Sequence, residues 1–230
     1  MMTRSTLLFL LLFAVILSTL SSCKKSEDIG TDISFISVYN ATTNVSSLNF
    51  QINSEAIGAS SLGIGQKSVY YGVYSGLWST EAIVGGGTSS FKKDMTFVAG
   101  EHNSLFVIGS ADAIDYFIIA DDINSKDPNR VKIKFLNLSA YPGALTLDIQ
   151  LLNNVISFPN QAYKSFTDYQ TLNGGTVYTL TLKDAATNST IGTPVTSEFR
   201  QGKMYTIWAK GTPNAAVEAQ RLGIQISEVN

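Results

Sequence analysis

The feature that most constrains the fold of this chain is an alternation of apolar and polar residues that recurs along it. In the second half, residues 131–138, 145–149 and 178–182 alternate in this way, residues 204–209 are expected to form another strand, and residues 222–226 close the chain. A period of two places every second side chain on one face of a β-strand, so each strand is expected to bury one face. Turn-forming residues separate these segments. The spacing predicts an antiparallel β-sandwich.

The first half shows the same order of segments. Residues 35–38 lie 100 residues before residues 135–138, and residues 48–52 correspond to residues 145–149. Three further residues recur 102 positions later: Phe97, Gly100 and Gly109 match Phe199, Gly202 and Gly211. Collinear matches at a nearly constant offset indicate an internal repeat. We therefore expect a first β-sandwich module over residues 32–122 and a second over residues 131–230.

The segment between the two copies is polar. Residues 123–130 contain Pro128 and are expected to form an inter-domain linker. Acidic and amide side chains in this region could supply oxygen ligands to calcium, but they lack the Asp-x-Asp-x-Asp-Gly order of a dedicated site. No metal site is predicted.

The N-terminal residues have the pattern of an export signal. Eleven apolar residues, 7–17, follow Arg4, and this run is shorter than the roughly 20 residues of a membrane-spanning helix. Residues 20–23, Leu-Ser-Ser-Cys, resemble a bacterial lipobox. The resemblance implies that residues 1–22 are a cleaved lipoprotein signal peptide, that Cys23 carries the lipid, and that residues 23–31 are a polar tether. An ordinary signal peptide followed by a chance cysteine is the alternative.

Lipidation would place the protein in the bacterial cell envelope. Two or more acyl chains hold a protein stably on a bilayer, so we expect an outer-membrane location that faces either the periplasm or the cell surface. Without residues 1–22 the chain has 15 basic and 18 acidic residues, a balance that argues against nucleic-acid binding. The expected partners are the membrane, through the lipid on Cys23, and a glycan or an envelope or surface protein.

Residues for catalysis are scarce. His102 is the sole histidine and Cys23 the sole cysteine, so neither a Ser-His-Asp triad nor a zinc site is predicted. Residues 85–90 are glycine-rich but lack the Gly-Lys-Ser/Thr ending of a phosphate-binding loop. Four acids, interpreted as solvated groups at strand ends, lie near the end of the first copy: Asp112, Asp115, Asp121 and Asp122. The chain is expected to be non-enzymatic and to need no cofactor.

The best binding candidate is aromatic. In a strand over residues 69–74, Tyr70 and Tyr74 share one face with Gly72 between them, and Trp78 follows shortly after. Tyrosine and tryptophan stack on sugars and anchor protein interfaces, so these three residues are candidate ligand-binding residues. The alternative is that tyrosine simply favours strands, or that the rings are buried where the two copies meet. Trp208 is expected in the core.

The motifs themselves resemble those of a known family. Gly65-Gln66, Tyr70-Tyr71 and residues 76–78 resemble the Gly-Gln, Tyr and Gly-x-Tyr core of the domain-of-unknown-function family 4397. Residues 135–143 resemble its opening strand and turn, and residues 202–206 its Gly-Lys-x-Tyr-Thr strand. The resemblance covers residues 33–229. It implies two tandem immunoglobulin-like antiparallel β-sandwich domains in a secreted or lipid-anchored protein, and it implies no catalytic residues.

These observations predict a lipid-anchored envelope protein with a non-catalytic role in binding, adhesion or structure. The alternative is a carbohydrate-binding accessory lipoprotein of a glycan-uptake system, with Tyr70, Tyr74 and Trp78 as its platform.

Overall fold

The structure, a computed structural model, describes residues 32–87 and 89–229. The predicted signal peptide, Cys23 and the tether lie outside the described residues. Strands dominate the described part of the chain, which contains no α-helix and only short 3-10 turns. The prediction of an all-β sandwich fold is therefore confirmed.

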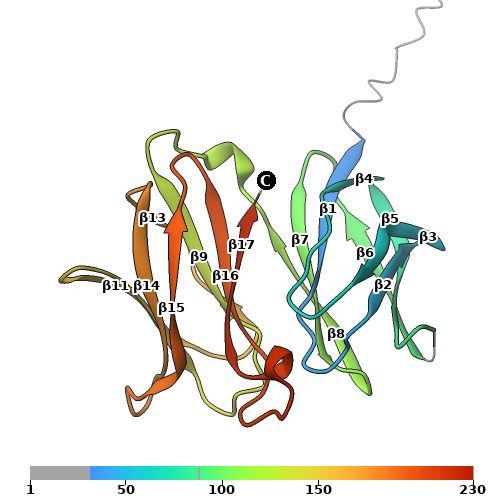
Figure 1. Ribbon diagram of the computed structural model, residues 1–230. Coiled ribbons are helices and arrows are strands. Elements are labelled where there is room, and N and C mark those ends of the chain that lie inside the picture. The colour runs from blue at the N-terminus through green and yellow to red at the C-terminus, as the bar shows by residue number, and fades with distance from the viewer. Residues whose placement is uncertain (1–31, 88, 230) are drawn as a thin grey trace, which may run out of the picture. The chain divides into compact units, whose positions relative to one another are not determined.

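Eight strands form the first sandwich (Figure 1). They are β1 (Ile33–Asn40), β2 (Leu48–Ile52), β3 (Glu55–Leu62), β4 (Tyr71–Tyr74), β5 (Gly76–Val84), β6 (Ser89–Phe97), β7 (His102–Ser110) and β8 (Ala113–Ala120). Sheet I has the order β3-β2-β5-β6, and sheet II has the order β4-β1-β7-β8.

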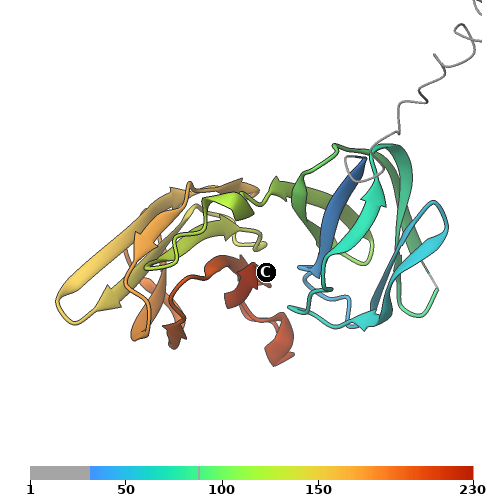
Figure 2. The ribbon, with the colours of Figure 1, turned by 90° about the horizontal axis from the view of Figure 1, so that it is seen from above.

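Nine strands form the second sandwich, which Figure 2 shows in yellow-green to red. They are β9 (Val131–Asn137), β10 (Leu145–Leu151), β11 (Asn154–Gln161), β12 (Ser165–Phe166), β13 (Gln170–Leu172), β14 (Thr176–Asp184), β15 (Thr190–Phe199), β16 (Met204–Lys210) and β17 (Gly223–Val229). Sheet III has the order β12-β9-β16-β17, with β13 also paired to β9, and sheet IV has the order β11-β10-β14-β15. The 3-10 turns are η2 (Ile123–Ser125) and η3 (Glu218–Gln220).

Both sandwiches have the same connectivity, with two short strands, β12 and β13, in place of β4. Most ladders are antiparallel, but β1 pairs with β7 in parallel, and so does β9 with β16. These ladders also correct the sequence alignment of the first strands. Val38 pairs with Leu105, and Phe135 pairs with the equivalent residue Ile207. Val38, and not Phe35, therefore corresponds to Phe135.

Each sandwich has a hydrophobic core of its own. Residues of one face of β1 and β7, such as Val38 and Leu105, pack only with other residues of the first sandwich. Phe135 and Ile207 do the same in the second sandwich. Alternate residues of a strand point to the same face, so the alternation of apolar residues in the sequence places these side chains together.

A third apolar cluster, which we call the junction, draws on both sandwiches. Its members come from the opposite faces of sheets II and III: Tyr39, Ala41, Phe106, Ile108, Ile119, Leu136, Leu138 and Trp208. Because of it, β7 and β16 are buried on both faces. Burial of both faces explains why residues 102–110 do not alternate as a half-exposed strand would. With this contact between the sandwiches, residues 32–230 cluster as one compact unit.

Two equivalent glycines are required by the backbone. Gly109 has φ +91°, and a Cβ there would lie 2.0 Å from the carbonyl oxygen of Ala113. Gly211 has φ +80°, and its Cβ would lie 2.4 Å from the carbonyl oxygen of Arg221. Since only glycine tolerates both the conformation and the approach, its recurrence in the sequence reflects a repeated backbone feature.

A repeated asparagine ends the first strand of each sandwich. The Nδ2 of Asn40 donates to the carbonyl oxygens of Val45 and Leu62, and its Oδ1 accepts from the backbone N–H and the hydroxyl of Thr42. Asn137 forms the corresponding bonds to Gln161 and Ser139. These buried amides satisfy backbone groups where the chain leaves the sheet.

Candidate functional site

An open cleft of about 410 Å³ lies at one end of the first sandwich. The end of the β2–β3 hairpin forms one wall, and β4 with the start of β5 forms the other. We call it the first cleft, and its lining residues are Ile52, Asn53, Glu55, Ala56, Ile57, Tyr71, Gly72, Val73, Tyr74 and Trp78. Two of the three aromatic residues predicted to bind ligand, Tyr74 and Trp78, are therefore brought together.

Trp78 is held in the first cleft by its own hydrogen bond. Its Nε1 donates to the carbonyl oxygen of Tyr74 at 2.8 Å, while its ring packs on the edge of the core. Tyr74 is 62% exposed. Gly72 lies in the middle of β4, between Tyr71 and Val73 in the sequence, and a Cβ there would lie 3.2 Å from Ile33. The missing side chain keeps the middle of β4 flat beside the rings.

Tyr70 lies outside the first cleft. Its hydroxyl donates to Oδ2 of Asp121 at 2.6 Å, and its ring meets the edge of His102 at 5.4 Å between centroids. A strand rises about 3.3 Å per residue, so Cα atoms four positions apart are about 13 Å apart. The predicted strand over residues 69–74 is present only as β4, Tyr71–Tyr74; Tyr70 lies just before it and does not form one platform with Tyr74. Tyr71, which the sequence analysis did not select, takes the third place.

The first cleft offers chemistry suited to binding. Glu55 is exposed, and no described side chain forms an ion pair with it. Its carboxylate and the amide of Asn53 can accept or donate hydrogen bonds beside the rings of Tyr74 and Trp78. Glu55 is the only acidic residue in the lining, so the paired carboxylates of a glycosidase are not assembled there.

A group of polar residues surrounds Asp121, beside the apolar residues of the junction. Asp121 is only 5% exposed, and its Oδ2 accepts from the hydroxyls of Ser104 and Tyr70, both at 2.6 Å. Burial raises the pKa of the Asp121 carboxyl; these two hydrogen bonds and the charges of Lys134 and Lys67 offset the effect only in part. The prediction that Asp121 is a solvated strand-end acid is wrong, because sheet III covers this end of sheet II.

The two lysines belong to the same buried group. The Nζ of Lys67 donates to the carbonyl oxygen of Glu228 at 2.5 Å. The Nζ of Lys134 donates to the carbonyl oxygen of Ala120 at 3.2 Å and lies 4.2 Å from the centre of the Tyr169 ring. Burial lowers the pKa of both lysines, whereas the charge of Asp121 acts in the opposite direction.

Four buried polar atoms in this region have no hydrogen-bond partner among the described residues. They are Oδ1 of Asp121, the hydroxyl of Tyr169, Oγ1 of Thr206 and Nε1 of Trp208. Burial without a protein partner typically costs stability unless ordered water bonds the group. Polar groups are therefore buried beside the junction at some cost in stability.

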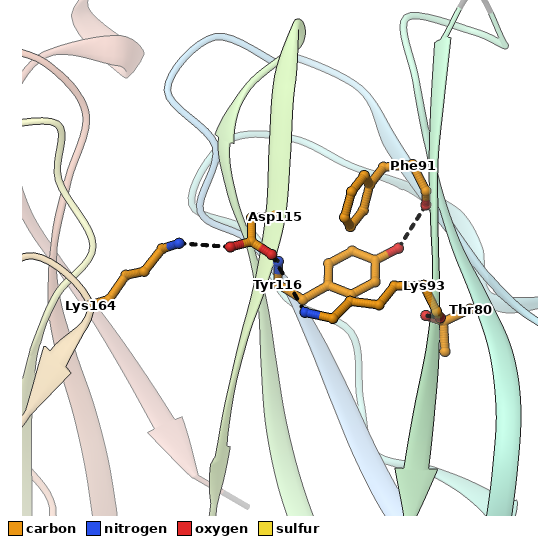
Figure 3. A network of polar contacts seen from close by, with 6 residues as sticks. All are labelled: Thr80, Phe91, Lys93, Asp115, Tyr116 and Lys164. Carbon is orange, nitrogen blue, oxygen red and sulfur yellow. Dashed lines mark hydrogen bonds and ion pairs between the residues drawn. The ribbon is translucent and has the colours of Figure 1, made fainter.

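Asp115 forms an exposed polar contact, shown in Figure 3, at another part of β8. Lys164 binds its Oδ2 at 2.6 Å, and Lys93 approaches its Oδ1 at 3.7 Å. Partial burial raises the pKa of the Asp115 carboxyl, but the hydrogen bonds from Lys164 and the Tyr116 backbone, together with the charges of Lys164 and Lys93, outweigh it, so the pKa is lowered overall. Behind it, the Tyr116 hydroxyl donates to the carbonyl oxygen of Phe91 at 2.9 Å, and burial raises the pKa of Tyr116 to about 12 (Figure 3).

Comparison with models of known protein families identifies the family of this chain. The model of a domain of unknown function, DUF4397, matches residues 34–148, which is half of the chain. The chain belongs to the DUF4397 family. A comparison with curated proteins found no match.

The DUF4397 match includes the first cleft, Asp121, β9 and the first four residues of β10. In the described part of this DUF4397 chain, no three histidine, cysteine or acidic side chains are grouped as metal ligands. His102 stacks on Phe35, with 4.5 Å between ring centroids. None of the described segments is a helix long and apolar enough to cross a membrane.

Proposed function

We propose that this DUF4397 protein is a lipid-anchored, non-catalytic binding protein of the bacterial cell envelope, and that it binds its partner in the first cleft. The observation that carries the proposal is the cleft itself, an open hollow lined by three aromatic rings. Ligand sites are typically concave and largely apolar, with a few polar groups that fix orientation. Among the lining residues, Glu55 and Asn53 are placed to do this.

The rigidity of the cleft supports a binding role. The Nε1 bond of Trp78 fixes its ring before any ligand arrives, and a preorganised surface loses less entropy on binding. Tyr74 is the most exposed ring and so has the most surface to bury. We expect it to contribute more to affinity than the half-buried Tyr71.

The second candidate is a carbohydrate-binding accessory lipoprotein of a glycan-uptake system. Exposed rings beside a carboxylate and an amide are the combination that recognises a sugar, because the rings cover its C–H faces and the polar groups bond its hydroxyls. The first cleft has this combination in Tyr74, Trp78 and Glu55.

A titration with saccharides separates the two candidates. Trp208 is fully buried, so a ligand-induced change in tryptophan fluorescence reports on Trp78. If the ligand is a glycan, Tyr74→Ala should weaken binding by about tenfold or more, the effect of losing 1.4 kcal/mol. Tyr70→Phe is the matched control and should bind normally, because Tyr70 lies outside the cleft.

No response to a broad panel of glycans would remove the carbohydrate candidate and leave a protein or peptide partner. Equal loss of binding in Tyr70→Phe and Tyr74→Ala would contradict the assignment to the first cleft.

The proposed anchor is tested by Cys23→Ala. The wild type should fractionate with membranes, and the variant should be soluble once released, because a bound lipid supplies about 0.8 kcal/mol per buried CH₂ group. Protease added to intact cells tells surface from periplasm. A Cys23→Ala protein that stays with the membrane unchanged would overturn the lipoprotein assignment.

A further inference from the structure

The second sandwich has a cleft at the place equivalent to the first. It has a volume of about 190 Å³ and lies between the β10–β11 hairpin, β13 and the start of β14. We call it the second cleft, and its lining residues are Arg130, Ile149, Leu151, Asn154, Ile156, Thr171, Leu172, Asn173 and Tyr178. Since the two sandwiches share their connectivity, the repeat has duplicated the hollow as well as the strands.

One hydrogen bond recurs in both clefts. Trp78 is the third residue of β5, and Tyr178 is the third residue of β14. The Tyr178 hydroxyl donates to the carbonyl oxygen of Asn173 at 3.0 Å, just as Trp78 donates to Tyr74 at 2.8 Å. The aromatic residue in each sandwich thus ties the start of one strand to the edge segment that walls the cleft.

The two clefts differ in charge. The first contains Glu55 and no basic residue, whereas the second contains Arg130 and no acidic residue. Arg130 is exposed, and its Nε donates to the carbonyl oxygen of Leu172 at 3.2 Å. That bond holds the guanidinium at the wall of the cleft. None of the acidic side chains in residues 32–87 and 89–229 forms an ion pair with it.

Around Arg130 the lining combines apolar and amide groups. Ile149, Ile156 and Leu172 supply apolar surface, and the amides of Asn154 and Asn173 lie at the exposed rim. A guanidinium with free terminal N–H groups matches the two oxygens of a carboxylate, and it keeps its charge at any physiological pH.

We propose that the second cleft is a separate binding site for a small carboxylate. The carboxylate binds the terminal nitrogens of Arg130, and the body of the ligand lies on the apolar surface. The chain then carries two sites of opposite charge built on one backbone plan. Because Arg130 does not line the first cleft, the second site does not depend on the function proposed for the first.

The test compares carboxylates with neutral analogues of the same shape. Ligand-observed NMR on the purified, detergent-solubilised full chain would use two pairs: D-glucuronate with D-glucose, and N-acetylvaline with its amide. At least one carboxylate should bind about tenfold or more tightly than its neutral partner. The pair that responds tells whether the carboxylate belongs to a sugar acid or to a peptide C-terminus.

Variants then show whether the carboxylate binds at Arg130. Arg130→Gln should lose the preference for the carboxylate, and Arg130→Lys should retain only part of it, because an ammonium cannot form the paired contact. Lys126→Gln removes the same charge from an exposed residue outside both clefts, so it is the matched control and should leave the preference unchanged. The proposal is overturned if neither carboxylate is preferred, if Arg130→Gln keeps the preference, or if Lys126→Gln removes it. Should Arg130→Gln fail to fold, Arg130→Lys carries the test.

Discussion

Replacing Trp208 with alanine is expected to lower the free energy of unfolding by about 3–5 kcal/mol, as for other large core aromatics. Trp208 has no exposed surface, and its ring lies edge-on to Tyr39 and Phe106 at 5.5 and 5.4 Å between centroids. Its removal leaves a cavity between sheets II and III that the surrounding β-strands cannot easily close. Urea unfolding followed by circular dichroism would measure the loss.

Trp208→Phe is the informative control. It keeps most of the apolar contact and deletes Nε1, which has no partner among the described residues. Deleting an unsatisfied buried donor offsets part of the lost packing, so the cost should be within about 1.5 kcal/mol. A loss below about 1 kcal/mol for Trp208→Ala would contradict the packing of the junction.

The same variant examines the prediction of two separate domains. If each sandwich is stable on its own core, Trp208→Ala should expose residues 121–130 to protease and release fragments that resist further digestion. Complete degradation without such fragments would show that the two sandwiches need the junction to stay folded.

Replacing Asp121 with alanine is expected to lower the free energy of unfolding far more than replacing it with asparagine. Asp121→Ala leaves the hydroxyls of Tyr70 and Ser104 and the charge of Lys134 without their partner, which should cost about 3–5 kcal/mol. Asp121→Asn keeps an oxygen that can accept both hydrogen bonds and removes the charge whose burial is unfavourable, although it also takes the opposite charge away from Lys134. We expect it to lose much less stability at neutral pH than Asp121→Ala.

The pH dependence follows from the raised pKa of Asp121. The unfolded chain has an aspartate pKa of about 3.9, so above that pH the folded state holds this proton more tightly than the unfolded state. The contribution of Asp121 to stability is therefore greatest below about pH 4 and is lost as the pH rises through the folded pKa.

The measurement is the difference in unfolding free energy between wild type and Asp121→Asn across acidic to neutral pH. Relative to the variant, the wild type should become less stable as the pH increases. A difference that is constant with pH, or that changes in the opposite direction, would show that Asp121 is not buried as a charged group in the junction.

Much of the fold could be predicted from local sequence. Alternation in residues 131–138 and 145–149 predicted strands that the structure contains, and glycine at 109 and 211 marked equivalent backbone features. These signals are local, because the side-chain period of a strand and the positive φ of a turn are set by adjacent residues. The expected burial of Trp208 was also correct.

The binding candidates were only partly predictable. Tyr74 and Trp78 lie together because they are close in sequence and tied by a hydrogen bond. Tyr70 instead forms a hydrogen bond with Asp121, which is 51 residues away in the sequence. Local sequence could not predict this contact. The contribution of Arg130 to a cleft likewise depends on β13, whose Leu172 is 42 residues further along the chain.

By itself, then, the sequence determined the strands, because alternation is a pattern of neighbouring residues, and it indicated the repeat, because the same short patterns recur about 100 residues later. Tertiary structure alone decided the parallel pairing of β1 with β7 and of β9 with β16, the burial of Asp121, and the presence of two equivalent clefts with opposite charge. The physical reason is that alternation gives a strand two faces without stating what covers either. In β1 and β9 both faces are covered, one by the core of the same sandwich and the other by the junction.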